Sequence, residues 1–411
     1  MTDSSQRAPS ASLSERAEAL RPSATVAVAQ KARQLRARGV DVLSFSLGEP
    51  DFPTPAHVVE AAVRALRDGR GDRYTSVGGI PELREAIAEV SAARRGGQRH
   101  APAEVVVSVG AKHTLFNLAL ALFDPGDEVI VPTPAWVSYP AQVRLAGARP
   151  VLVPTGPEQG FRLAPEQLEA ALTERTRAIV LCTPSNPTGA AYRAEDLRAL
   201  AEVLERRPDV WVIVDEIYGQ LVYEGFEQRS MLEVAPQLRE RLVVVDGVSK
   251  TYAMTGWRIG WMLGPEPLAR AVEKIQGQST TNPTAVAQHA ALAALTGPQE
   301  PVERMRAAFA ERRRRVVDGL GALPGVRCRC PEGAFYAFPD VSGLLGRRTP
   351  EGRRIEDDVQ LAEWLLEAAH VALVPGTAFE APGFLRMSYA ASLEQIEEGL
   401  GRLGEALATL Q

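Results

Sequence analysis

The segment Leu242–Lys250, LVVVDGVSK, predicts a buried strand that ends in a polar turn. A nearly continuous apolar run is expected where helices cover both faces of a parallel sheet. Similar runs predict further strands, and helical patterns lie between them. The strands are Val105–Val109, Glu128–Val131, Ala178–Cys182, Val210–Asp215 and Ile259–Leu263, and the helices are Pro81–Arg94, His113–Phe123, Pro165–Thr173 and Ala194–Arg206. This alternation predicts an α/β domain.

The two ends of the chain depart from this pattern. Residues 1–12 are rich in serine, proline and alanine and are predicted to be disordered, and a helical pattern runs from Leu13 to Gly39. After Thr296-Gly297-Pro298 a long arginine-rich helix begins, in which Arg312 to Arg315 predict a solvated face. The later strand candidates are shorter and lie at Ala334–Phe338, Val371–Val374 and Phe384–Tyr389. We expect residues 301–411 to form a second, α+β unit.

The composition excludes several classes of protein. The formal net charge of -5 gives no overall field that would attract nucleic acid or an anionic membrane. No apolar run approaches the ~20 residues of a membrane span, and the N-terminus lacks the apolar core of a signal peptide. The sequence has three cysteines, and Cys328 and Cys330 are too close for a comfortable disulfide. We expect a soluble, cytoplasmic protein.

Lysine is scarce in this sequence. Of 46 basic residues only four are lysine: Lys31, Lys112, Lys250 and Lys274. A coding bias toward arginine explains the scarcity, and positions that keep lysine are then enriched for roles that arginine cannot fill. A lysine amine can lose its proton and attack an aldehyde, whereas a guanidinium does not deprotonate in proteins.

Small and polar residues follow several predicted strands. In open α/β sheets, ligands bind outside the carboxyl ends of the strands. Free backbone N–H groups at a strand-to-helix turn can hold a phosphate. The residues at these ends are Gly110, Ala111, Asn186, Asp215, Tyr218, Ser249 and Lys250. Each has another explanation when taken singly, because a strand-end aspartate often caps a helix and Asn-Pro-Thr-Gly is a good turn without chemistry.

Other common site motifs are absent. The sequence contains no GxGxxG, GxxxxGK[ST], GxSxG or HExxH, and its five histidines show no metal-ligand spacing. We therefore expect no metal and favour a lysine-centred site. Pyridoxal phosphate (PLP) needs an amine for its aldehyde, a carboxylate for its ring nitrogen, donors to its phenolate oxygen, and cations with N–H groups for its phosphate. The candidates, in that order, are Lys250, then Asp215, then Tyr218 with Asn186, then Arg258 with Ser249 and Ala111.

Four motifs make the sequence similar to a known family. GVSKTYAMTGWRIG resembles the lysine site of class I/II aminotransferases, in which an arginine follows the lysine by eight residues. SNPTG, DEIY and GEPDF (Gly48–Phe52) are also typical, and the motifs occur in family order between Leu13 and the C-terminus. The resemblance is strongest to the bacterial aspartate aminotransferases of subgroup I-β, some of which also act on prephenate.

The resemblance implies a fold type I architecture. This has a large domain with a mostly parallel seven-stranded sheet flanked by helices, and a smaller α+β domain. The implied division is a disordered N-terminus at 1–12, an N-terminal arm with part of the small domain at 13–56, a large PLP-binding domain at 57–300, and a small C-terminal domain at 301–411.

The resemblance also implies which residues hold the cofactor. Lys250 forms a Schiff base with PLP and moves the proton, and Asp215 pairs with the ring nitrogen. Tyr218 and Asn186 contact the phenolate oxygen. Trp136 stacks on the ring, although an ordinary core aromatic is the alternative. The residues around the phosphate are Gly110, Ala111, Lys112, Ser249 and Arg258.

Further residues are implied to bind the substrate or to belong to a neighbouring subunit. Arg386 grips the substrate α-carboxylate, and Gly48 offers backbone to the same group. Trp136 and Asn186 also border the substrate. Tyr74 reaches the phosphate of a neighbouring subunit, which implies a homodimer with shared active sites.

Substrate preference depends on three further residues. In the relatives, a serine, a threonine and a lysine that match Ser23, Thr25 and Lys112 hold the distal carboxylate of dicarboxylic substrates. The resemblance therefore implies transamination by a ping-pong mechanism between aspartate or glutamate and 2-oxoglutarate or oxaloacetate, with prephenate as a further acceptor. One departure is Gly247, where relatives often have a phosphate-binding serine two residues before the lysine.

Two alternatives remain open from the sequence. Other reactions of the same fold, such as those of a carbon–sulfur lyase, a decarboxylase or a cyclopropane-forming synthase, share Lys250 and Arg258. A PLP-binding sensor of a transcription regulator belongs to a different class. It normally carries a basic DNA-binding module, whereas about a dozen residues precede the similar region here.

Overall fold

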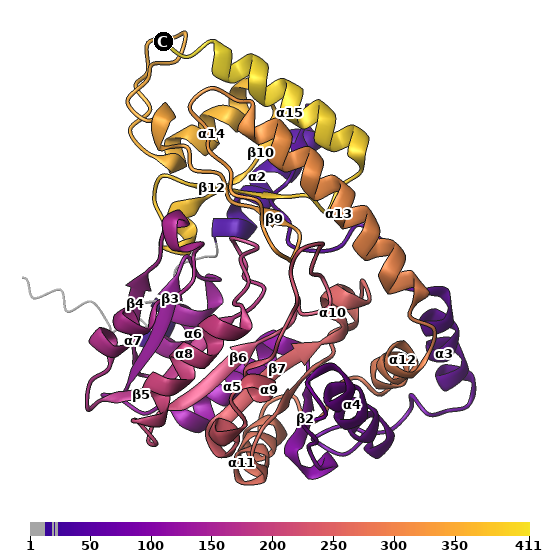
Figure 1. The fold of residues 1–411 in the computed structure, drawn as a ribbon. Helices are drawn as coiled ribbons and strands as arrows, with labels where there is room; N and C mark the ends of the chain where they lie inside the picture. Colours follow the sequence, from indigo (N-terminus) through magenta and orange to yellow (C-terminus); the bar gives the residue numbers. More distant parts are fainter. Residues whose placement is uncertain (1–12, 19, 21–23) are drawn as a thin grey trace, which may run out of the picture.

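The computed structural model describes residues 13–18, 20 and 24–411. Its centre is a seven-stranded sheet in the order β2-β8-β7-β6-β5-β3-β4 (Figure 1). The strands are β2 (Val105–Ser108), β3 (Glu128–Thr133), β4 (Arg149–Pro154), β5 (Thr176–Cys182), β6 (Trp211–Asp215), β7 (Leu242–Gly247) and β8 (Gly260–Leu263). Neighbours from β4 to β7 pair in parallel, whereas β8 is antiparallel to both β2 and β7. The mostly parallel seven-stranded sheet is therefore confirmed.

Helices pack on both faces of this sheet. The helices between residues 56 and 296 are α3 (Ala56–Arg67), α4 (Pro81–Arg94), α5 (Ala111–Leu122), α6 (Ser138–Leu145), α7 (Pro165–Ala171), α8 (Ala194–Glu205), α9 (Met231–Val234), α10 (Val248–Thr251), α11 (Glu266–Gly277) and α12 (Ala285–Thr296). Successive strand residues alternate between two cores: Val212 and Val214 belong to the core that includes residues of α8, and Ile213 belongs to the core that includes residues of α5 and α11. This explains why the strands are continuous apolar runs.

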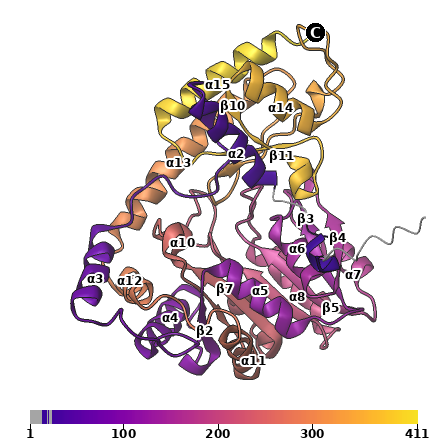
Figure 2. The same ribbon diagram turned by 180° about the vertical axis from the view of Figure 1, so that it is seen from behind.

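A second layer lies above the carboxyl edge of the sheet in Figure 1. Its helices are α13 (Glu300–Gly321), α14 (Asp358–Ala368) and α15 (Leu393–Ala408), and its small sheet has the order β11 (Val374–Pro375), β12 (Leu385–Ser388), β9 (Tyr336–Ala337). The N-terminal part contributes α1 (Glu15–Glu18), α2 (Ala24–Ala37) and β1 (Leu43–Ser44). β1 pairs in parallel with β10 (Val371–Ala372), and α2 lies beside β10 and β11 (Figure 2). Leu43 and Phe45 thereby join the core of the second layer.

The prediction of a solvated face for Arg312 to Arg315 is wrong for two of the four residues. Arg312 and Arg313 are each 8% exposed, whereas the side chains of Arg314 and Arg315 are 55% and 62% exposed. Arg312 pairs with Asp51 at 2.7 Å, and Arg313 donates to the carbonyl of Pro331 at 3.0 Å.

Among the helices of the described residues, none combines the length and the apolar character that a membrane span requires.

Candidate active site

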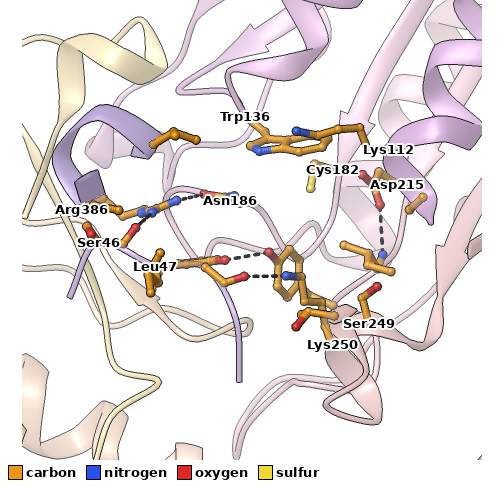
Figure 3. A pocket seen from close by; sticks show the side chains of 18 of the residues that line it. Ser46, Leu47, Lys112, Trp136, Cys182, Asn186, Asp215, Ser249, Lys250 and Arg386 are labelled. Atoms are coloured by element: carbon orange, nitrogen blue, oxygen red, sulfur yellow. Dashed lines mark hydrogen bonds between the residues drawn. The ribbon is translucent and has the colours of Figure 1, made fainter. Parts of the chain in front are cut away.

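A cavity of about 360 Å³ lies between the carboxyl edge of the large sheet and the second layer. This is within the size range of small-molecule sites. The predicted site residues that line it are Gly48, Ala111, Lys112, Trp136, Asn186, Asp215, Tyr218, Ser249, Lys250, Arg258 and Arg386. Figure 3 shows Arg386 and Asp215 on opposite sides of the cavity, with Trp136 across from Lys250.

Lys250 belongs to the short helix α10, which starts directly after β7. Its Nζ donates a hydrogen bond to the carbonyl of Gly48. Burial lowers the pKa of Lys250 to about 8, against the opposing effect of Glu49. A substantial share of this amine is therefore neutral near physiological pH, as a nucleophile or a base requires.

Asp215 ends β6 and is buried. Its carboxylate accepts hydrogen bonds from the Tyr139 hydroxyl at 2.8 Å and from the backbone N–H of Ile217 at 3.1 Å. Burial raises the pKa of Asp215 to about 6. A carboxylate held in this way is suited to pair with a protonated ring nitrogen, because the cation would offset the cost of its desolvation. Tyr139 was not predicted from the sequence. Its position three residues after Trp136 was the only signal for it.

The start of α5 and Arg258 form one end of the cavity. Gly110 precedes α5 with a φ of 81°, and a Cβ there would come within 2.5 Å of Arg258 Nη2. Gly260 is equally constrained, since its Cβ would come within 2.2 Å of the Ala111 nitrogen. A helix N-terminus, a guanidinium and the Ser249 hydroxyl together fit a phosphate dianion.

Gly247 departs from the phosphate-binding serine that the resemblance implies two residues before the lysine. A Cβ at this glycine would meet the Ile259 carbonyl at 2.9 Å and the Gly260 Cα at 3.0 Å. Both contacts are with backbone atoms of the neighbouring strand region, so the position leaves no room for a serine. Ser249 and Arg258 both line the cavity and stay predicted side-chain donors for a phosphate.

Arg386 projects from β12 and is 2% exposed. Its Nη1 donates to Asn186 Oδ1 at 2.9 Å and its Nη2 donates to the Ser46 carbonyl at 2.6 Å. Its Nε is buried and has no hydrogen-bond partner among the described residues. An unsatisfied buried donor is costly, and a carboxylate ligand would satisfy it.

Lys112 lies beside Trp136, with its Nζ 4.9 Å from the centre of the ring (Figure 3). Desolvation, followed by the charge of Arg258, lowers the pKa of Lys112. Ser23 lies outside the described residues, and Thr25 is in the first turn of α2, although its side chain is outside the described part. The structure does not bring Tyr74 to this cavity: the residue is 89% exposed.

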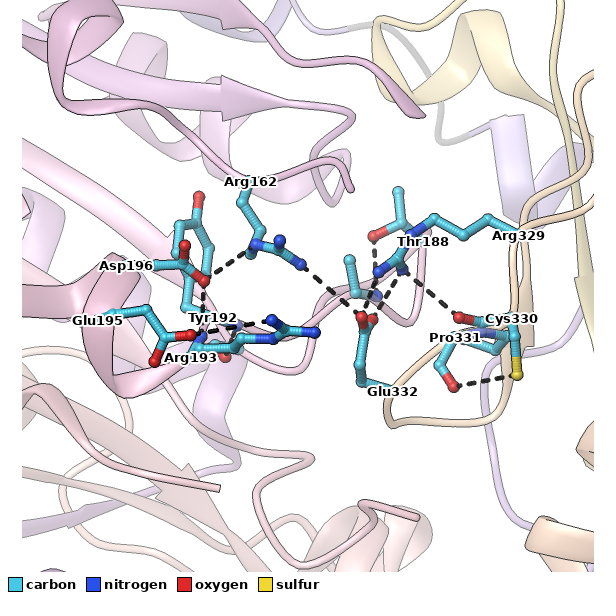
Figure 4. A network of polar contacts seen from close by, with 12 residues as sticks. Arg162, Thr188, Tyr192, Arg193, Glu195, Asp196, Arg329, Cys330, Pro331 and Glu332 are labelled. Atoms are coloured by element: carbon cyan, nitrogen blue, oxygen red, sulfur yellow. Dashed lines mark hydrogen bonds and ion pairs between the residues drawn. The ribbon is translucent and has the colours of Figure 1, made fainter. Parts of the chain in front are cut away.

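A polar network fastens the loop that carries Asn186 (Figure 4). Arg162 pairs with Asp196 at 3.0 Å and with Glu332 at 3.7 Å. The backbone N–H of Gly333 donates to the Gly189 carbonyl at 2.9 Å. These contacts join the loop between β5 and α8 to the segment before β9, and they support the position of Asn186 next to Arg386.

Further residues line the cavity that the sequence did not predict. They are Val26, Ala29, Arg33, Ser46, Leu47, Tyr139, Cys182, Ile217, Thr255 and Tyr336. Val26, Ala29 and Arg33 are spaced by three and four residues, which puts them on one face of α2. Tyr336 is buried and hydrogen-bonds Tyr218, and no motif in the sequence marked it.

Known proteins resemble this chain over nearly its whole length. Residues 40–403 match the family described as aminotransferase class I and II. An aspartate/prephenate aminotransferase of Cereibacter sphaeroides is 49% identical over 391 residues, which are 95% of this chain and 97% of the relative. An aspartate aminotransferase of Geobacillus stearothermophilus is 46% identical over 394 residues, which are 95% and 98% of the two chains.

Solved structures show the same fold. The aspartate aminotransferase of Rhizobium meliloti has a TM-score of 0.95 at 44% identity, covering 98% of this chain and 100% of that one. The enzyme of Thermus thermophilus with maleate has a TM-score of 0.90 at 46% identity, covering 97% and 100%. The chain is therefore an aminotransferase and belongs to the class I and II aminotransferases, a PLP-dependent family.

Proposed function

We propose that this chain binds PLP through Lys250 and transfers the amino group of aspartate or glutamate to a 2-oxo acid by a ping-pong mechanism. The acceptors would be 2-oxoglutarate or oxaloacetate, with prephenate as a further one. One observation carries this proposal: a single cavity holds a lysine between a buried carboxylate, Asp215, and a buried arginine, Arg386. The names of the similar aspartate and aspartate/prephenate aminotransferases support it.

The donor set of the cavity fits PLP at each of its polar groups. Asp215 would pair with the ring nitrogen, Tyr218 and Asn186 would contact the phenolate oxygen, and Trp136 would cover the ring. The start of α5, Ser249 and Arg258 would hold the phosphate. The buried Arg386 Nε, which has no partner among the described residues, supports a ligand carboxylate at the opposite end.

Bound PLP supplies an aldehyde that bonds to amines and a ring that accepts electrons. The protein then has to orient the substrate and to move protons. Arg386 would grip the α-carboxylate and so fix the substrate α-carbon near Lys250 Nζ. With its pKa lowered to about 8 by burial, Lys250 can take up a proton at one carbon and release it at another.

Lys112 supports the preference for dicarboxylic substrates. Its ammonium faces the cavity next to Trp136 and has no ion pair within the described part of the chain. A second substrate carboxylate would pair with this charge, whereas a neutral side chain would leave the charge uncompensated. Aspartate and glutamate should therefore be better donors than alanine or phenylalanine.

We also propose a homodimer with shared active sites. Tyr74 is 89% exposed in the single chain, and Leu66 on α3 is 57% exposed. The resemblance implies a phosphate contact for Tyr74, and its exposure in the single chain supports a role in the site of a partner subunit. The region around Tyr74 and α3 would then be covered in the assembly.

The substrate assignment is tested by kcat/KM for aspartate, alanine and phenylalanine in wild type and Lys112→Ala. Loss of a carboxylate partner at a partly desolvated site should cost aspartate about 10- to 100-fold, and alanine less than about threefold. Lys31→Ala is the matched control, because Lys31 forms an exposed pair with Glu367 at 3.8 Å, away from the cavity lining. Equal losses for all three donors, or a wild type that favours alanine, would contradict the dicarboxylate preference and leave the transaminase assignment intact.

A further inference from the structure

Tyr336 contacts three of the proposed site residues at once. It lies in β9, is fully buried and lines the cavity. Its hydroxyl is 2.8 Å from the hydroxyl of Tyr218, and its ring centre is 4.8 Å from the guanidinium carbon of Arg386. A Cβ at Gly48 would come within 2.6 Å of the same hydroxyl. One side chain thus connects the proposed phenolate contact to the proposed carboxylate contact.

The direction of the Tyr218–Tyr336 hydrogen bond follows from proton counting. Burial raises the pKa of Tyr336 to about 12 and that of Tyr218 well above its ordinary value, so both hydroxyls keep their protons. Each hydroxyl has one proton to donate and two lone pairs to accept with. Among the described residues, Tyr218 is the hydrogen-bond partner of the Tyr336 hydroxyl, and no second one is found. When Tyr218 donates its proton to the cofactor, Tyr336 must therefore donate to Tyr218.

We propose that Tyr336 is a positioning residue for transamination: its hydroxyl strengthens Tyr218 as a hydrogen-bond donor, and its ring holds the Arg386 guanidinium in place. This inference rests on the proposed function, because it concerns contacts to PLP and to a substrate carboxylate. A hydroxyl that accepts one hydrogen bond becomes a stronger donor in the next, since the bonds polarise each other. A guanidinium is held over an aromatic face by cation–π attraction, which grows when water is excluded.

The hydroxyl and the ring can be separated by substitution. The groups that act on Tyr336 are Arg386 on β12, Tyr218 after β6, Cys182 at the end of β5, and Glu49 after β1. Tyr336→Phe keeps all of these and the ring under Arg386, and it removes one oxygen atom. Tyr336→Leu removes the ring as well. The first variant isolates the effect on Tyr218, and the second adds the effect on Arg386.

The primary measurement is the pKa of the bound cofactor's chromophore, read from the absorbance of the holoenzyme between pH 5 and 10. A donor to the phenolate oxygen favours the form that has lost the chromophore's proton, so a weaker Tyr218 should raise this pKa. Cooperativity between hydrogen bonds strengthens a charge-assisted bond by about 10–30%. Without the Tyr336 hydroxyl, the chromophore should hold its proton about two- to threefold more tightly, so its pKa in Tyr336→Phe should be higher by about 0.3–0.5.

The second measurement is the dissociation constant of maleate, a dicarboxylate that cannot react. Tyr336→Phe should change it less than about twofold because the ring remains, whereas Tyr336→Leu should weaken it about tenfold. The control is Tyr389→Phe, which removes another buried hydroxyl, one that donates to the Ala334 carbonyl at 3.2 Å outside the cavity lining. This control should leave both quantities unchanged.

The possible outcomes separate the two proposals. A wild-type protein that takes up no PLP, or that transfers no amino group from aspartate or glutamate, would contradict the proposed function itself. A wild type that titrates normally, with Tyr336→Phe giving the same pKa, would overturn the role of the hydroxyl. Equal shifts in Tyr336→Phe and Tyr389→Phe would also overturn it, because the cause would then be general packing. Unchanged maleate binding in Tyr336→Leu would overturn the role of the ring.

Discussion

Arg95 joins the two strand ends that carry Asp215 and Lys250, and replacing it should destabilise the fold in a pH-dependent way. The guanidinium is 5% exposed and lies just after α4. It donates to Glu216 at 2.7 Å, to Asp246 at 2.8 Å and to Ser91 at 2.9 Å. Glu216 follows Asp215 directly, and Asp246 accepts from the Gly247 N–H at 2.7 Å, at the start of the turn to Lys250. One buried cation therefore balances two buried carboxylates.

The magnitude follows from the burial of the partners. Arg95→Met keeps much of the side-chain volume and leaves Glu216 and Asp246, 4% and 6% exposed, without a counter-charge. Breaking a buried ion pair on one side costs about 3–5 kcal/mol. At an unfolding entropy of about 2.1 cal/mol/K per residue, a chain of 411 residues loses about 4–6 °C in Tm.

The pH dependence has a defined sign. Burial already raises the pKa of Glu216, and Arg95 is the largest influence that opposes this rise. Removing Arg95 should raise that pKa further, so the folded variant binds a proton at a pH where the unfolded chain has released it. Stability then falls as the pH rises through this window. The Tm deficit should be largest near pH 8 and should shrink toward pH 5.

The assay is thermal unfolding of wild type, Arg95→Met and Arg175→Met at pH 5, 6.5 and 8. Arg175 also pairs with a buried carboxylate, Glu128, at 2.6 Å, but its own side chain is 67% exposed and Arg149 remains on the same carboxylate. Its loss should cost about 1 °C or less. A deficit of Arg95→Met that matches Arg175→Met, or that is the same at pH 5 and pH 8, would refute this account of the buried cluster.

Four further predictions concern the proposed site. Lys250→Ala should abolish covalent attachment of the cofactor and nearly all turnover while PLP still binds, as measured by mass and absorbance; normal transamination by this variant would contradict the central assignment. Burial raises the pKa of Asp215 to about 6, so its carboxylate becomes protonated as the pH falls through 6. The affinity of the wild-type apoprotein for PLP should therefore drop about tenfold from pH 7 to pH 5, relative to the change in Asp215→Asn. Fluorescence titration measures this affinity. Asp215→Asn should also cost several orders of magnitude in rate and Asp215→Glu less, and equal losses would indicate a structural role. A mixture of Tyr74→Ala and Lys250→Ala proteins should gain up to about a quarter of wild-type activity when subunits are exchanged, beyond the activity of each protein alone, since one site in the mixed dimer is then intact; no gain despite exchange would count against shared sites.

Continuous apolar runs predicted six strands of the large sheet, because a strand buried on both faces leaves a strong local signal. The seventh, β4, was not found from its own sequence. Arg149–Pro154 contains two prolines, which is tolerated only because β4 is an edge strand and pairs with β3 alone. The sequence predicted that this helix starts at His113, whereas α5 starts at Ala111. Its true start also lacks a local signal, because Gly110 precedes the helix without a side-chain cap. The boundaries at 56/57 and 300/301 stay predictions.

The site residues likewise divide into those with a local signal in the sequence and those without one. Asp215 ends a strand, and Lys250 and Asn186 follow strands, each in a short motif, so the signal for each lies within a few residues of it. Tyr336 and Arg95 act through partners 118 and 121 residues away in the sequence, Tyr218 and Glu216. No local pattern distinguishes them from other buried tyrosines or from the many arginines of this chain. The three-dimensional structure was needed to identify them.

The scarcity of lysine is a sequence signal that identifies functional residues at some positions and not at others. Lys250 and Lys112 line the cavity, whereas Lys31 forms an exposed pair with Glu367 and Lys274 is exposed on α11. Arginine would serve an exposed ion pair as well as lysine does, so retention at Lys31 carries no functional information. Retention becomes informative only where the surroundings lower the amine's pKa, as burial does at Lys250 and partial desolvation does at Lys112. A guanidinium would stay charged in both places, and only an amine at position 250 can both bond to an aldehyde and carry a proton.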